Sequence, residues 1–408
     1  MDIQILKSSI SRQSSIAITG SKSESNRLLL LQALYPEISI SNLSNSDDSV
    51  LMQKALQSND EVVDIHHAGT AMRFLTAYFS TRVGRETILT GSSRMKERPI
   101  RILVDALKSL GADINYLENE GYPPLKINGK NLSKTKVSLN ANVSSQYISA
   151  LLLIASRLEN GLELTLDGKI TSVPYIKMTL ALLNEIGIDT EFEGNQILVK
   201  PFTSPPKVDN ITVESDWSSA SYFYSIIAMS EIGTQVSLSA YKVNSLQGDS
   251  VLSQIYGQFG VETQFDNNTV FIKKVTNVSI NTKIELDLSN APDIAQTISV
   301  TAFGLGLECS LSGLHTLKIK ETDRLVALKV ELEKLGAEVV ITDATLHLKP
   351  STKIFSDVEI ATYNDHRMAM AFAPLGLKTS LKVKDADVVS KSYPQFWEDL
   401  KTLGFNLK

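Results

Sequence analysis

Hydrophobic and polar positions recur along the chain in one pattern. An apolar series at helical spacing ends at a glycine, and a short alternating stretch follows that glycine. The pattern occurs in DALKSLGADINYL, LALLNEIGIDTEFE, QIYGQFGVETQF, LEKLGAEVVI and DLKTLGFNLK, around Gly111, Gly187, Gly260, Gly336 and Gly404. Each copy predicts a helix with glycine at its C′ position, followed by a strand.

The spacing of these copies predicts repeated α/β units. The glycines lie roughly seventy residues apart, and a sixth, degenerate copy, VLMQKALQSNDEVVDI, has Ser-Asn-Asp in place of glycine. Leu-x-x-Leu-Gly is also a common helix ending, but here the spacing and the following strand recur with it. Six units divide most simply into two domains of three, which suits a chain of 408 residues. The Pro-rich segment 201–210 is the best candidate for a linker.

The composition is typical of a globular protein in water, with 43% hydrophobic and 21% charged residues. The net charge of −5 gives no overall attraction to nucleic acid or to an anionic membrane. The single Cys309 excludes an intramolecular disulfide and a cysteine-based metal cluster. The N-terminus has no apolar signal segment, and the longest apolar run is too short to span a bilayer. We therefore expect a cytoplasmic protein.

Common catalytic motifs are absent from the sequence. It contains no P-loop, no H-E-x-x-H, no G-x-S-x-G and no G-x-G-x-x-G. His66 and His67 are the only adjacent histidines. Neighbours on a strand point to opposite faces, so we do not expect this pair to share a metal ion.

Strings dense in cations and hydroxyl groups occur where helices are expected to begin. They are GSKSESNR at 20–27, AGTAMRF at 68–74, SSRMKERPI at 92–100, VSSQYISALL at 143–152, KETDRL at 320–325 and TYNDHRMAMAF at 362–372. Pro99 suits the first turn of a helix, and the helix after KETDRL is expected to begin at Thr322 or Asp323. One such start could be an ordinary N-cap. Several in one chain predict a site for several phosphates or carboxylates.

Two carboxylates could transfer protons among these cations. Glu321 lies between Lys320 and Arg324, and Asp293 lies in NAPDIAQTIS, just before an apolar helix. From sequence alone, Asp293 is more readily explained as an N-cap. Nearby cations should keep either carboxylate ionised and able to accept a proton.

Taken together, these strings resemble the 5-enolpyruvylshikimate-3-phosphate (EPSP) synthase family. The resemblance covers GSKSESNR, AGTAMR, MKERPI, VSSQ, PYI, VESDWSSASYF, PDIAQT, KETDR, TYNDHRMAM and a final K-x-Y-P, in family order from residue 20 to 394. It implies an α/β (α+β) fold of two lobes, each with three βαβαββ units, the inside-out barrel of enolpyruvyl transferases. Residues 1–20 and 215–408 would form one lobe and 21–214 the other, with the active site in the cleft between them.

The resemblance also implies the reaction. The family transfers the enolpyruvyl group of phosphoenolpyruvate to the 5-hydroxyl of shikimate 3-phosphate and releases phosphate, through a tetrahedral intermediate. The reaction belongs to the shikimate pathway of aromatic amino-acid biosynthesis and uses no metal or organic cofactor. We expect a monomer that binds these two small molecules and neither nucleic acid nor membrane.

Individual residues take roles by the same resemblance. Those expected to bind shikimate 3-phosphate are Lys22, Ser23, Arg27, Ser144, Ser145, Gln146, Ser172, Tyr175, Asp293, Thr316 and Lys320. Those expected to bind phosphoenolpyruvate are Lys22, Gly69, Arg98, Gln146, Arg324, Arg367 and Lys391. Asp293 would take the proton of the 5-hydroxyl. Glu321, assisted by Lys22, would exchange a proton at the methylene carbon.

The sequence departs from the family pattern at four positions. His67 and Thr316 stand where Asn is usual, Phe74 where Pro is usual, and Val173 where Lys is common. None is a proposed proton-transfer residue, so we expect altered affinities and retained chemistry.

Two other functions need to be considered. The sister enolpyruvyl transferase that acts on UDP-N-acetylglucosamine generally has Cys or Asp in the loop corresponding to SSRMKERP, and this loop has neither. A non-catalytic sugar-phosphate binding paralogue would be expected to lose Lys22, Asp293 or Glu321, and all three are present.

Overall fold

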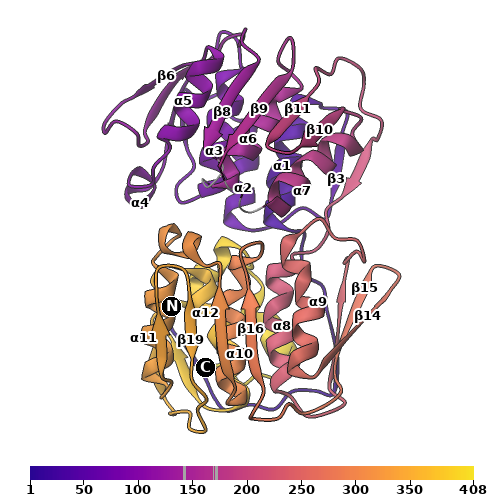
Figure 1. Ribbon diagram of the computed structural model, residues 1–408, viewed down its shortest axis with the longest axis vertical. Helices are drawn as coiled ribbons and strands as arrows, with labels where there is room; N and C mark the ends of the chain where they lie inside the picture. Colours follow the sequence, from indigo (N-terminus) through magenta and orange to yellow (C-terminus); the bar gives the residue numbers. More distant parts are fainter. Residues whose placement is uncertain (141–143, 169, 171–172) are drawn as a thin grey trace. The chain divides into compact units, whose positions relative to one another are not determined.

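The chain folds into two compact units. The computed structural model describes residues 1–140, 144–168, 170 and 173–408 (Figure 1). Unit 1 consists of Met1–Thr19 and Glu214–Lys408, and unit 2 of Gly20–Val213. Both boundaries lie one residue earlier than the sequence analysis places them. Gly20 belongs to unit 2 because it packs there: a Cβ on it would lie 1.9 Å from the carbonyl oxygen of Asn42 and 2.7 Å from the Val213 side chain.

The segment 201–210 is not a linker, which corrects the sequence prediction. It lies within unit 2, and the chain passes between the units at Val213–Glu214. The Phe202 N–H donates to the Ser156 carbonyl at 2.9 Å, and the Phe202 ring packs edge-on against Tyr35. A Pro-rich polar composition fits a linker, but it fits equally well an extended segment that packs along a unit.

In the described part of the chain, unit 2 contains three small sheets. The strands of the first, in spatial order, are β4 (Val62–Asp64), β5 (Glu86–Thr90), β7 (Leu125–Asn128) and β6 (Asp113–Tyr116). Those of the second are β8 (Lys136–Asn140), β9 (Leu162–Asp167), β11 (Gln196–Val199) and β10 (Thr190–Glu193). In both, the first pair is parallel and the next two pairs are antiparallel. The third sheet is the parallel pair β3 (Ser39–Ser41) and β12 (Asn210–Thr212).

Unit 1 repeats this topology. Its first two sheets have the orders β2 (Gln13–Ile16), β13 (Gln235–Ser239), β15 (Thr269–Lys274), β14 (Val261–Asp266) and β16 (Lys283–Asp287), β17 (Glu308–Ser312), β19 (Leu346–Leu348), β18 (Val339–Ile341). The third joins β20 (Val358–Ile360), β21 (Leu381–Val383) and β1 (Ile3–Ile5), and β1 also bridges antiparallel to Leu407. The repeated α/β units expected from the sequence are therefore present in both units.

Helices connect the strands of each repeat. Those of unit 2 are α1 (Lys22–Leu34), α2 (Asp47–Gln57), α3 (Gly69–Ser80), α4 (Ser93–Lys96), α5 (Arg101–Leu110), α6 (Ser145–Ala155) and α7 (Val173–Glu185). Those of unit 1 are α8 (Trp217–Met229), α9 (Leu252–Ile255), α10 (Ala295–Leu305), α11 (Arg324–Lys334), α12 (His366–Phe372) and α13 (Phe396–Leu403). Short 3-10 turns are η1 (Gly248–Val251), η2 (Tyr256–Phe259), η3 (Pro292–Ile294), η4 (His315–Ile319), η5 (Ala373–Leu377) and η6 (Ala386–Lys391).

The central helices of each unit are buried on all sides. Every residue of α3 and of α12 is buried, as are almost all those of α8 and α10. Helices that are apolar all round belong in the interior. In unit 1, α10 packs against α8 and α12. Arg367 at the start of α12 donates to Ser218 at the start of α8 and to the carbonyl of Asp293 just before α10, so the three starts lie near one another. The polar residues that precede and open these helices are thereby brought together.

The predicted glycine endings are confirmed. Gly111, Gly187, Gly260, Gly336 and Gly404 all have positive φ, between 75° and 112°. The degenerate copy differs as its sequence requires, because Ser58, the C-cap of α2, has a φ of −73°. Local sequence thus determines how each of these helices ends.

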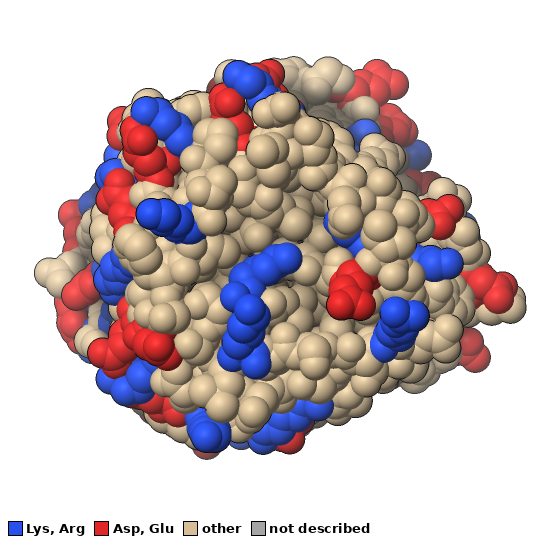
Figure 2. All heavy atoms as spheres, turned by 90° about the horizontal axis from the view of Figure 1, so that it is seen from below, with Lys and Arg blue, Asp and Glu red and all other residues tan. Residues whose placement is uncertain are grey.

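Charged side chains on the outside of the protein are of both signs. Figure 2 shows one face, on which basic and acidic side chains are interspersed among uncharged residues. On this face the mixture agrees with the small net charge. A binding site for anions therefore has to come from local groups of cations.

Lys274 of β15 is a charged residue in the interior of unit 1. It is 1% exposed, and its Nζ donates to the Phe259 carbonyl at 2.8 Å. Burial, with a contribution from the charge of Lys378, lowers the pKa of Lys274 from 10.5 to about 8. The folded state therefore binds fewer protons than the unfolded state between these two pH values, and stability should rise with pH across that window.

We predict that Lys274→Met removes this pH dependence. The measured quantity is the difference between the free energies of unfolding of wild type and variant, wild type minus variant. This difference should be lowest below pH 8 and should rise towards pH 10.5, by at most about 1.4 kcal/mol per pH unit. Urea unfolding at several pH values measures it. Lys273→Met, at an exposed position on the same strand, is the control. A difference that stays constant from pH 7 to 10.5 would contradict the prediction.

Candidate active site

The helix that follows KETD begins at Arg324, one residue after Asp323, the later of the two expected starts. Asp323 is the N-cap of α11, and its side chain accepts from the Val326 N–H at 3.2 Å. Arg324 is therefore the first residue of the helix, at the end where the helix dipole is positive. Its side chain is 2% exposed. A buried cation at this place requires nearby negative charge.

Three carboxylates supply that charge. Nε of Arg324 donates to Oδ2 of Asp365 at 2.6 Å, Nη1 to Oδ1 of Asp293 at 2.8 Å, and Nη2 to Oε2 of Glu321 at 2.8 Å. Burial opposes the charged guanidinium, but the carboxylates outweigh burial and raise the pKa of Arg324 above its ordinary value. The guanidinium thus holds both proposed proton-transfer carboxylates, Asp293 and Glu321.

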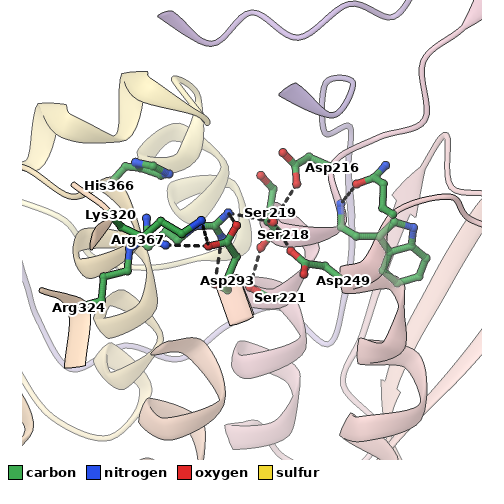
Figure 3. A network of polar contacts seen from close by, with 12 residues as sticks. Asp216, Ser218, Ser219, Ser221, Asp249, Asp293, Lys320, Arg324, His366 and Arg367 are labelled. Atoms are coloured by element: carbon green, nitrogen blue, oxygen red, sulfur yellow. Dashed lines mark hydrogen bonds and ion pairs between the residues drawn. The ribbon is translucent and has the colours of Figure 1, made fainter. Parts of the chain in front are cut away.

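Asp293 is not an N-cap, contrary to the expectation from sequence alone. Helix α10 begins at Ala295 with Ile294 as its N-cap, and Asp293 lies in η3. Its carboxylate, 13% exposed, instead faces three cations (Figure 3). They are Arg324, Lys320 with Nζ at 3.4 Å, and Arg367 with Nη2 at 3.5 Å. The N-cap preference is local, and these longer-range ion pairs override it.

Arg367 connects two further elements to this network. Asp365 caps α12 by accepting from the Arg367 N–H at 2.8 Å. The Arg367 side chain donates from Nη1 to the Asp293 carbonyl at 3.2 Å and from Nη2 to Ser218 Oγ at 3.1 Å. Ser218 in turn donates to Asp249. Ser218 lies in VESDWSSASYF, one of the strings that resemble the family, but neither it nor Asp249 was predicted to belong to the site.

Two other predicted residues of unit 1 lie on neighbouring loops. Lys391 ends η6, and its Nζ donates to the Asn364 carbonyl at 2.6 Å, in the loop that leads into α12. Thr316 lies in η4, and its buried Oγ1 makes no hydrogen bond to the residues that the structure describes. The structure therefore brings Asp293, Lys320, Glu321, Arg324 and Arg367 into direct contact, with Lys391 on the α12 side.

In unit 2, Arg27 is the centre of a second group. Helix α1 begins at Lys22, as predicted, so Lys22 and Ser23 lie in its first turn. Arg27 is 2% exposed and donates to Oγ of Ser149 at 2.9 Å, to Oγ1 of Thr179 at 2.8 Å and to the Ser23 carbonyl at 2.6 Å. Burial lowers the pKa of Arg27 to about 10.

Aromatic rings cover the Arg27 guanidinium. Its central carbon lies 5.5 Å from the centre of the Phe74 ring and 6.0 Å from that of Tyr175. Ring faces stabilise a cation without neutralising its charge. Arg27 thus remains a cation within a frame of hydroxyl groups and rings.

Gly69 and Arg98 lie against each other. Helix α3 begins at Gly69, as predicted, and a Cβ there would lie 2.5 Å from Nη1 of Arg98. Gln146 reaches the same helix start, because its Nε2 donates to Thr70 Oγ1 at 3.1 Å. Ser144 is the N-cap of α6, so Ser145 and Gln146 lie in its first turn as expected. Ser172 lies outside the described residues.

The prediction that Pro99 of SSRMKERPI lies in the first turn of a helix is wrong. Helix α5 begins at Arg101 with Ile100 as its N-cap, so Pro99 precedes the helix and is not in its first turn. A short helix, α4, forms earlier because Ser92 caps it. Of the three cations, Arg94 pairs with Glu97 at 2.7 Å and Lys96 with Glu118 at 2.5 Å. Arg98 is the one that reaches the start of α3.

The histidine pair does not lie on a strand, which corrects a premise of the sequence analysis. Strand β4 ends at Asp64, and His66 has a φ of 46°. The two rings meet, with 2.7 Å between the Nδ1 atoms of His66 and His67, and His67 Nε2 lies 3.5 Å from Asp47. Among the described residues, no group of three or more His, Cys, Asp or Glu could hold a metal ion.

Two further observations concern the single cysteine and the character of the helices. Cys309 is buried on β17, and burial raises the pKa of its thiol to about 12, so it is not a reactive thiolate. Within the described ranges, none of the helices has the length and apolar character needed to cross a membrane.

Comparison with known proteins gives agreeing results. The family model for EPSP synthase (3-phosphoshikimate 1-carboxyvinyltransferase) matches residues 53–400. The chain is 45% identical to the 3-phosphoshikimate 1-carboxyvinyltransferase of Bacteroides fragilis (strain YCH46), over 97% of this chain and 96% of that protein. It is 36% identical to the protein of the same name from Histophilus somni (strain 2336), over 96% of each chain.

Solved structures share the fold. EPSP synthase from Acinetobacter baumannii matches with a TM-score of 0.81 at 22% identity, over 100% of this chain and 99% of that one. The enolpyruvyl transferase NikO from Streptomyces tendae matches with a TM-score of 0.75 at 13% identity, over 100% of this chain and 98% of that one. At these identities the likeness establishes the fold alone, whereas the extent of the sequence matches establishes the family. The chain belongs to the EPSP synthase family.

Proposed function

We propose that this protein transfers the enolpyruvyl group of phosphoenolpyruvate to the 5-hydroxyl of shikimate 3-phosphate and releases phosphate. The observation that carries the proposal is the arrangement around Arg324, which holds Asp293 and Glu321 on one guanidinium with Lys320 and Arg367 beside them. Two carboxylates for proton transfer, surrounded by cations for two anionic substrates, meet the needs of this reaction.

The chemistry follows from two proton transfers. Asp293 takes the proton of the 5-hydroxyl while the hydroxyl oxygen bonds to C2 of phosphoenolpyruvate. Glu321, assisted by Lys22, delivers a proton to the methylene carbon, which gives a tetrahedral ketal phosphate. The C2–O bond to phosphate then breaks, and the departing phosphate takes the proton held by Asp293. The methyl group returns its proton to Glu321, and the enol ether forms. Carboxylates held within reach of the reacting atoms make these transfers efficient.

The cations hold two anions that would otherwise repel each other. For phosphoenolpyruvate we propose Lys22, Gly69, Arg98, Gln146, Arg324, Arg367 and Lys391. For shikimate 3-phosphate we propose Lys22, Ser23, Arg27, Ser144, Ser145, Gln146, Ser172, Tyr175, Asp293, Thr316 and Lys320. The positive groups also stabilise the charge on the departing phosphate.

Arg324 has few N–H groups left for a substrate. It has five N–H donors, and the contacts with Asp365, Asp293 and Glu321 use four of them. An arriving carboxylate would therefore receive one N–H, or would displace Glu321 or Asp293 from the guanidinium. Such displacement would release a carboxylate for proton transfer as the substrate binds.

We further propose that the protein acts in the cytoplasm as a monomer, within the shikimate pathway, and needs neither nucleic acid nor a membrane. The UDP-N-acetylglucosamine reaction is disfavoured because the loop at 92–99 has no Cys or Asp and Cys309 is buried.

Phosphate release tests the function. Purified protein with both substrates should release phosphate in step with formation of the enol ether, which NMR can identify. Omitting shikimate 3-phosphate, or replacing it with UDP-N-acetylglucosamine, should abolish release. Absence of turnover where an established synthase is active would refute the proposal.

Glu321→Gln should lower kcat by about 100-fold or more, because general acid–base groups contribute on that scale. The amide oxygen can still accept from Arg324, so KM for both substrates should change only a few-fold. Steady-state kinetics of the two proteins measure the split. Glu333→Gln, a charge removal later on the same helix, is the control. A raised KM with unchanged kcat would make Glu321 a binding group only.

Gly69→Ala should raise KM for phosphoenolpyruvate by about tenfold, equivalent to about 1.4 kcal/mol. The new Cβ would displace the Arg98 guanidinium from the start of α3. KM for shikimate 3-phosphate should change much less. Gly257→Ala is the matched control, since no atom lies within 4 Å of a Cβ at that position. Equal changes for both substrates would argue against the role of Gly69 and Arg98.

A further inference from the structure

Asp249 is a buried carboxylate to which the proposed reaction assigns no role. It lies in η1 and is 4% exposed. Its Oδ2 accepts a hydrogen bond from Ser218 Oγ, and its Oδ1 makes no hydrogen bond within the described part of the chain. Burying a half-satisfied carboxylate is costly. Packing alone therefore does not explain why a carboxylate is buried at this position.

Ser218 relays the effect of this carboxylate to Arg367. Its hydroxyl has one hydrogen, which goes to Asp249, so its oxygen is free to accept from Arg367 Nη2 at 3.1 Å (Figure 3). The hydrogen bonds thus run in one direction, from guanidinium to hydroxyl to carboxylate. Without the acceptor at Asp249, the hydroxyl could rotate and its lone pairs would no longer be fixed towards Arg367.

The other side of Arg367 faces Asp293. Nη1 donates to the Asp293 carbonyl at 3.2 Å, and Nη2 lies 3.5 Å from Asp293 Oδ2. The guanidinium therefore lies between Ser218 of α8 and Asp293 of η3. Oδ2 of Asp293 faces Arg367, and Oδ1 faces Arg324 and Lys320.

We propose that Asp249 is a positioning residue for the transfer reaction and acts through Ser218 to hold the guanidinium of Arg367 against Asp293. The inference rests on the proposed function and adds a residue to it. Asn at position 249 could accept the same hydrogen bond without burying a charge. What the carboxylate adds is a negative charge one hydroxyl group away from Arg367.

The surroundings of Asp249 make its charge sensitive to pH. Burial and the charge of Asp293 raise the pKa of Asp249 to about 6, against the effects of Arg367 and Ser218. Asp216, the N-cap of α8, also raises it. Helix α9, which packs on η1, has no titratable side chain. Asp249 is thus ionised at neutral pH and becomes protonated as the pH falls through about 6.

Kinetics of Asp249→Ala, Asp249→Asn and Ser218→Ala test the proposal. Asp249→Ala and Ser218→Ala should each lower kcat/KM for phosphoenolpyruvate about 10- to 100-fold, with a smaller loss for Asp249→Asn. The double variant Asp249→Ala/Ser218→Ala should be no worse than either single variant, because both break one chain of hydrogen bonds. Tyr256→Phe is the control, because it removes a buried hydroxyl that bonds to Thr301 on neighbouring elements.

A pH profile separates positioning from a merely structural role. At each pH from 5.5 to 8, kcat/KM of Asp249→Asn is divided by that of wild type, so that titration of the substrates' phosphates cancels. The ratio should be lowest at neutral pH and should approach one below pH 6, where wild-type Asp249 is itself uncharged. A variant that is only less stable would give a ratio independent of pH.

The possible failures are distinguishable. If wild type does not turn over, the proposed function fails. If wild type turns over but Ser218→Ala and Asp249→Asn keep its kcat, KM and pH profile, the positioning role is overturned. Additive losses in the double variant would overturn it as well. Should Asp249→Ala not fold, Ser218→Ala and Asp249→Asn, which change the side-chain volume little, still decide the question.

Discussion

The ion pairs of the buried Arg324 are the interaction on which the organisation of unit 1 depends. Through Asp365, Asp293 and Glu321 this guanidinium ties together the starts of α12, α10 and α11. Helices α10 and α11 connect the strands of one sheet, and α12 connects two strands of another. Removing one partner of a buried charge pair costs about 3–5 kcal/mol, because the other charge stays desolvated. The three helix starts are therefore coupled. The residues that stabilise this part of the fold are also those proposed to carry the chemistry.

Unit 2 accommodates its buried cation differently. Arg27 is surrounded by hydroxyl groups, carbonyl groups and two aromatic rings, and none of its hydrogen bonds in the described residues goes to a carboxylate. Burial accordingly lowers its pKa, whereas carboxylates raise that of Arg324. An arriving phosphate would find in unit 2 a guanidinium without a direct carboxylate hydrogen bond, although the charge of Glu24 acts on it. Arg27 of unit 2 thus keeps its hydrogen bonds to hydroxyl and carbonyl groups, whereas Arg324 of unit 1 holds the carboxylates proposed to transfer protons.

What could be predicted from the sequence was mainly what is local. Glycine at C′ depends on residues a few positions apart, and the structure confirms this prediction. The helix starts expected near Asp323 and Ser144 are equally local, and the structure has these two residues as N-caps. Asp293 was misread because its partner Arg324 lies 31 positions away, and that contact outweighs a capping preference. The contacts of Asp249 with Ser218 are just as remote, so no local pattern signals them. The family resemblance supplied the remaining site residues, since it reflects contacts that periodicity cannot show.

The departure from the family pattern at Phe74 can be understood from the surroundings of Arg27. Proline inside a helix removes one backbone hydrogen bond, and Phe74 lets α3 keep it through this turn. The phenyl ring is fully buried and lies under the Arg27 guanidinium. It thus stabilises a desolvated cation that has no carboxylate in hydrogen-bond contact, by an interaction that leaves the charge available to an anion. Phenylalanine in place of proline at position 74 changes what packs against the Arg27 guanidinium and leaves Arg27 itself in place.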